Sequence, residues 1–94
     1  MNRFWEKDYP RAIASALEVL EIRRRHVRDA TREDGDFSAA QHALTGLTMQ
    51  RVTVEGMRAA GRAILGHDLE SRLYGEGEKI AEPWTNGHRE GLRE

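Results

Sequence analysis

Apolar residues recur every three or four positions along the first third of the chain, at Ile13, Ala16, Leu17, Leu20, Val27 and Ala30. In a helix this spacing places all of them on one face. The segment Asp8-Tyr9-Pro10 is typical of a helix start, because proline loses no hydrogen bond in the first turn. We therefore predict a helix over about residues 9–31, with Glu21 and Arg25 as a favourable i, i+4 ion pair on its surface.

A second helical pattern follows a segment with the composition of a turn, residues 32–37. Ser38 and Gln41 have the spacing of a capping box, and Gly66 is placed to end the helix as a left-handed cap. The pattern predicts a helix over about residues 39–65. Two long helices joined by a short connection are typical of an antiparallel hairpin.

This second helix has apolar surface on more than one side, and three glycines lie inside it. Each glycine costs up to about 1 kcal/mol relative to alanine, which suggests that the glycines serve close packing. One broad face is rich in small residues and includes Met49, Val52, Gly56, Met57, Ala60 and Ile64. A single partner helix cannot cover two sides. We therefore expect this face to be a partner or dimer interface, most simply in a four-helix homodimer.

The C-terminal third is expected to be less regular. Asp68 is suited to cap a short third helix over about residues 69–74, and Gly75 and Gly77 then interrupt the pattern. The remaining polar residues, 76–94, are expected to form an irregular tail.

The predicted fold is accordingly all-α, with one helical domain over residues 1–75 followed by the tail. Trp84 is the one large aromatic residue of that tail. Tryptophan is enriched at binding hot spots, so Trp84 joins the candidate interface. Phe4, Trp5 and Tyr9 are expected to cover the open end of the thin bundle, because a small core needs aromatic area. The alternative is that some of these rings are exposed anchors for a partner.

Composition narrows the classes of protein. The net charge of −1 argues against general attraction to nucleic acid or to an anionic membrane. The chain has no cysteine, which excludes disulfides, thiolate metal sites and a cysteine nucleophile, and favours a cytoplasmic location. Its basic residues are thirteen arginines and two lysines. That bias fits a GC-rich bacterial or phage genome.

Chemistry-bearing residues form no recognisable constellation. The four histidines, His26, His42, His67 and His88, lack the i, i+3 or i, i+4 spacing of metal ligands on a helix. No serine lies in a nucleophile elbow, and no glycine-rich loop follows a strand. We therefore assign no catalytic, cofactor or metal residue and expect a protein that is not an enzyme.

Several arginines are candidates for contacts with phosphates or with an acidic partner: Arg51, Arg58 and Arg62, in one stripe along the second helix, and Arg23 and Arg25 in the densest basic cluster. The leading hypothesis is an interaction module, a small bacterial or phage accessory, adaptor or inhibitor protein that docks on a partner protein. A small nucleic-acid-binding regulator that uses these arginines is the first alternative. A helical-bundle metal-binding protein is the second.

Overall fold

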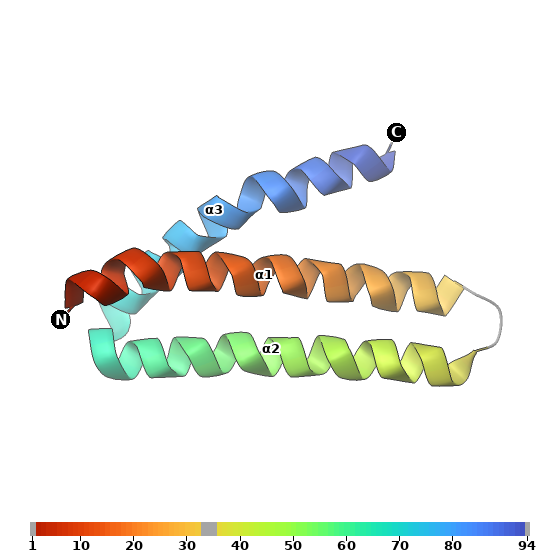
Figure 1. The fold of residues 1–94 in the computed structure, drawn as a ribbon, viewed down its shortest axis with the longest axis horizontal. Coiled ribbons are helices and arrows are strands. Elements are labelled where there is room, and N and C mark those ends of the chain that lie inside the picture. Colours follow the sequence, from red (N-terminus) through yellow and green to blue (C-terminus); the bar gives the residue numbers. More distant parts are fainter. Residues whose placement is uncertain (1, 33–35, 94) are drawn as a thin grey trace.

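The computed structural model of the chain consists of α-helices (Figure 1). It describes residues 2–32 and 36–93, and side chains over residues 5–32 and 36–83. The helices are α1 (Asn2–Arg32), α2 (Phe37–Leu65) and α3 (His67–Arg93). The prediction of an all-α fold is confirmed. Most of the predicted turn, residues 33–35, lies outside the described part of the chain.

The three helices form a thin, elongated molecule of 51 × 29 × 17 Å. α1 and α2 lie side by side and run in opposite directions (Figure 1). α3 begins behind this pair at the end where α1 starts, and its C-terminal turns extend away from both helices in this view. One face of the α1–α2 pair is therefore left uncovered by α3.

α1 begins at Asn2, seven residues before the predicted start, and Pro10 lies inside it. Proline removes one helical hydrogen bond, so packing must hold the preceding turn. Trp5 and Tyr9 lie one turn apart, their ring centroids separated by 6.2 Å. Tyr9 is buried and Trp5 packs against the same cluster. Tyr9 therefore takes the predicted place in the core and Trp5 is half-buried against it, whereas the side chain of Phe4 lies outside the described residues.

α2 ends where the sequence predicts and begins slightly earlier. Gly66 follows Leu65 with φ 87°, and its N–H donates to the carbonyl oxygen of Arg62. At the other end, the predicted capping box at Ser38 is wrong. Asp36 is the N-cap, and its carboxylate accepts a hydrogen bond of 3.1 Å from the N–H of Ala39. The Asp36 carboxylate precedes Ser38 and starts the helix two residues sooner.

α3 differs most from the prediction, because the short helix and irregular tail are replaced by one helix that continues to Arg93. Leu73, Gly77 and Ala81 are spaced four apart and all are buried. They form the stripe by which α3 packs on α1. Asp68 does not cap the helix. It lies in the first turn, and the carbonyl oxygen of Gly66 accepts the first hydrogen bond, from the N–H of Glu70.

The core gathers where the three helices meet. Its centre is Tyr9, Ile13 and Leu73. Two glycines permit this approach: a Cβ on Gly77 would lie 2.8 Å from the Pro10 carbonyl oxygen, and one on Gly61 would lie 2.9 Å from the Tyr9 ring. The close packing predicted for the glycines of the second helix is therefore found at Gly61, and Gly77 of α3 adds a close approach that was not predicted. Close packing is not found at Gly56, where an added Cβ would meet nothing within 4 Å.

Candidate interaction site

The uncovered side of the α1–α2 pair carries a continuous row of uncharged residues. We call it the open face: Trp5, Ala12, Ser15, Val19 and Ile22 of α1, with Met49, Thr53, Met57, Ala60 and Ile64 of α2. Within each helix these positions follow the three- and four-residue spacing that keeps side chains on one side. The α2 positions point away from the stripe that carries Arg58 and Arg62, which contact α3.

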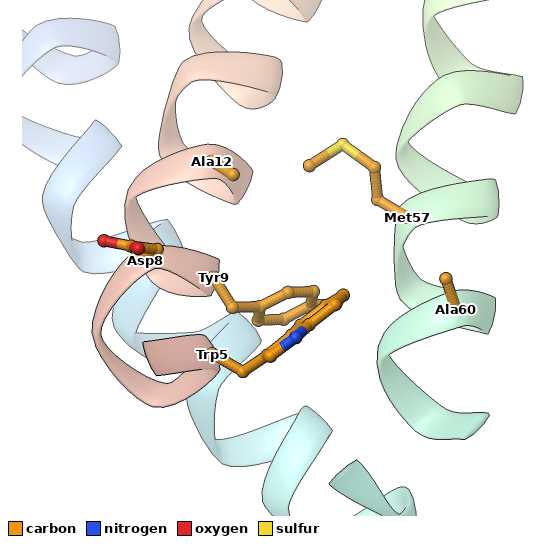
Figure 2. A pocket seen from close by; sticks show the side chains of 6 residues that line it. All are labelled: Trp5, Asp8, Tyr9, Ala12, Met57 and Ala60. Carbon is orange, nitrogen blue, oxygen red and sulfur yellow. The ribbon is translucent and has the colours of Figure 1, made fainter. Parts of the chain in front are cut away.

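A groove of about 360 Å³ lies at one end of the open face, between α1 and α2 (Figure 2). Trp5, Tyr9 and Ala12 line one wall, and Met57 and Ala60 line the other. Figure 2 shows the two rings reaching toward α2, whereas the carboxylate of Asp8 turns away at the rim. The walls are therefore apolar, a surface suited to another apolar side chain.

Apolar side chains on the open face remain exposed in the single chain. Met49 is 65% exposed and Ile64 is 50% exposed. On α1, Val19 is 37% and Ile22 is 50% exposed. Val19 and Ile22 were not among the predicted interface residues, although their three-residue spacing on a second side of the predicted first helix is a signal for them.

The other predicted interface residues have mixed positions. Val52 is 65% exposed, but it lies around the helix from the groove. Gly56 and Ala60 are exposed, and Met57 is half-buried beside the core. The side chain of Trp84 lies outside the described residues. Met57 is thus partly used by packing within the chain, whereas the other described members of the predicted interface stay exposed.

A second cluster surrounds Glu70, whose side chain is fully buried. The Tyr9 hydroxyl donates a hydrogen bond of 2.7 Å to its carboxylate. Arg58 donates through Nε at 2.9 Å and Nη2 at 3.1 Å, and Arg62 donates through Nε at 3.3 Å. The Arg58 guanidinium also stacks 3.8 Å from the centre of the Tyr74 ring. One carboxylate thus ties all three helices together.

Electrostatics within this cluster keep Glu70 ionised. Burial alone would raise the pKa of its carboxyl, but the hydrogen bonds from Arg58, Tyr9 and Arg62 outweigh burial and lower that pKa. The pKa of Tyr9 is raised, first by burial and then by its bond to the Glu70 carboxylate. The buried carboxylate faces two guanidinium groups, and both of its oxygens accept hydrogen bonds, an arrangement that holds helices in register.

The arginines predicted to contact a phosphate or an acidic partner have different surroundings in the structure. Arg58 and Arg62 are brought together on Glu70, whereas Arg51 is exposed. Arg25 pairs with Glu21 at 3.8 Å, as the sequence predicted. Arg23 is exposed, and its side chain lies over Gly46. Two arginines of the stripe, Arg51 and Arg62, therefore remain exposed, although Arg62 also contacts Glu70.

Neither a metal-binding cluster nor a membrane-spanning helix occurs among the described residues. No group of three or more histidine or acidic side chains there could hold a metal ion. No helix in that part of the chain has the length and apolar character needed to cross a membrane. The role of Glu70 was not predicted from the sequence. The only sequence signal for it is an acidic residue in the first turn of a helix.

Comparisons with known proteins return no relative. No family model matches the chain, and neither a curated protein nor a solved structure is similar to it at a significant level.

Proposed function

We propose that this chain is a non-enzymatic helical interaction module that acts by placing its open face against another protein chain. The observation that carries the proposal is the exposure of Met49, Ile64 and Ile22 on one uncharged face. Apolar patches of this kind on folded proteins mark interaction surfaces. A small accessory, adaptor or inhibitor protein of bacterial or phage origin, working in the cytoplasm, would have this form.

The groove supports the same proposal. It is bounded by aromatic and methionine side chains, Trp5, Tyr9 and Met57. Such residues form the centre of protein interfaces and dominate their binding energy. Polar groups of the neighbouring cluster, by contrast, are satisfied by one another around Glu70. A partner that binds at this end of the molecule would therefore gain affinity mainly by burying apolar surface.

Site-specific photo-crosslinking in native host cells tests the proposal. A benzophenone amino acid replaces Met49 on the open face or, as the matched control, Arg72, an exposed residue of α3. We expect a protein adduct from position 49 and much less from position 72. Adding Ala60→Glu at the edge of the groove should reduce the position-49 adduct about tenfold, while circular dichroism stays unchanged. Equal adducts at both positions, or none, would overturn the proposal.

A further inference from the structure

The single chain exposes more surface than a compact protein of its size. A compact monomer of 10.7 kDa exposes about 5,500 Å², whereas this chain exposes 6759 Å². Part of the excess belongs to the extended end of α3. A stable interface typically buries about 800 Å² on each partner, so the excess is of the size that one such contact removes.

Charge is distributed unequally along the open face. Asp8 lies at the end where α1 begins, beside the groove. Arg23 and His26 lie at the other end, about four turns along the same helix. Among the side chains that the structure describes, neither Asp8 nor Arg23 has an ion-pair partner. The groove end of the face thus carries the Asp8 carboxylate, with Arg11 at its edge one turn further along α1, and the other end carries the Arg23 guanidinium.

We propose that the occupant of the open face is a second copy of this chain, turned end for end so that the Asp8 end of each copy meets the Arg23 end of the other. The inference rests on the proposed function and names its partner. A two-fold axis across the helices near Ser15 and Thr53 produces this pairing, because position 15 is midway between Asp8 and Arg23. A two-fold axis along the helices would place the two Asp8 carboxylates at the same end.

The same geometry fills the groove. With the axis near Ser15, Val19 of one copy lies at the level of Ala12 of the other, and Ile22 at the level of the turn between Trp5 and Tyr9. Met49 lies at the level of Met57. Thr53 suits a position near the axis, because its hydroxyl already donates to the carbonyl oxygen of Met49, at 2.9 Å, and leaves its methyl group for packing. The result is a four-helix core with one α3 on each outer side.

Engineered cysteines test the arrangement without interference, because the chain has no cysteine of its own. Ser15→Cys or Thr53→Cys should form an intermolecular disulfide on mild oxidation, because positions at the axis approach their own copies. Ser71→Cys, exposed on α3, is the matched control and should not. Disulfides formed only when Ser15→Cys and Thr53→Cys chains are mixed would indicate the other axis and overturn the end-for-end pairing.

Light scattering and a charge exchange complete the test. The full chain should have twice its 10.7 kDa mass at micromolar concentration. Asp8→Lys or Arg23→Asp alone should weaken dimerisation about threefold to tenfold, and the two together should restore it to within about twofold. A monomer that still yields the Met49 crosslink to another protein overturns this inference and leaves the proposed function standing. Loss of both the dimer and every crosslink overturns both.

Discussion

Arg58 on α2 and Glu70 on α3 form a bidentate ion pair, in which Nε and Nη2 of the arginine each donate a hydrogen bond to one carboxylate oxygen. The pair crosses the sharp turn at Gly66, where the chain passes from α2 to α3. It fixes the angle between two helices that otherwise have few shared contacts. Because the Tyr9 hydroxyl reaches the same carboxylate, the first helix is held by the same group.

Substitution of Glu70 should therefore be costly. Glu70→Gln keeps the shape but leaves the two arginines without a matching charge, so we expect the free energy of unfolding to fall by about 3 kcal/mol. Chemical denaturation checks this value. Glu76→Gln, at an exposed position on the same helix, is the control and should change stability by less than about 0.5 kcal/mol. Equal effects of the two substitutions would contradict the assigned role.

Acid should destabilise the protein through the same residue. Its pKa is lower in the folded state than the ordinary 4.5, so the folded state holds fewer protons than the unfolded state. The stabilisation from Glu70 is complete above that ordinary value and is lost as pH falls through the folded pKa. Denaturation between about pH 6 and pH 3 should show a decline that is weaker in Glu70→Gln. Parallel curves for the two proteins would exclude Glu70 as its source.

Alkali should act through Tyr9. Its pKa is raised above the ordinary 10.0 in the folded state. Stability from this hydroxyl is therefore present below that ordinary value and is lost as pH rises toward the folded pKa. Tyr9→Phe should lower neutral-pH stability by about 1–2 kcal/mol, through the lost bond to a buried carboxylate. Tyr9→Phe should also make the loss of stability with rising pH less steep. It should not abolish that loss, because the pKa of Tyr74 is raised as well and Tyr74 contributes to it. An unchanged alkaline slope would contradict the assignment.

Two glycines should respond oppositely to alanine. At Gly77 a methyl group would lie 2.8 Å from the Pro10 carbonyl oxygen, so Gly77→Ala should push α3 from α1 and destabilise the fold by about 2 kcal/mol. At Gly56 nothing lies within 4 Å. Gly56→Ala should therefore stabilise α2 by up to about 1 kcal/mol, and Ala60→Glu in the background keeps the proposed contact of the open face out of the comparison. Thermal unfolding of both variants gives the comparison.

The sequence predicted the parts of this fold that depend on local pattern. The end of α2 at Gly66 and the Glu21–Arg25 pair follow from capping and from i, i+4 spacing. The length of α3 could not be predicted in this way, because Gly75 and Gly77 weaken the helix locally and the packing of Gly77 on α1 depends on the tertiary fold. The Glu70 cluster was hidden for a similar reason. Its donors lie 8, 12 and 61 residues away in the chain.

The position of the core at one end of the molecule has a consequence for how it opens. Tyr9, Ile13 and Leu73 join three helices near the N-terminus, whereas the far part of the hairpin, around Ala30 and Ala43, depends on two. Amide protons near Ala30 and Ala43 should exchange with solvent through local fraying, and those near Ile13 only through complete unfolding. The molecule should thus open first in the parts of α1 and α2 near Ala30 and Ala43, and the groove should be among the last features to be lost.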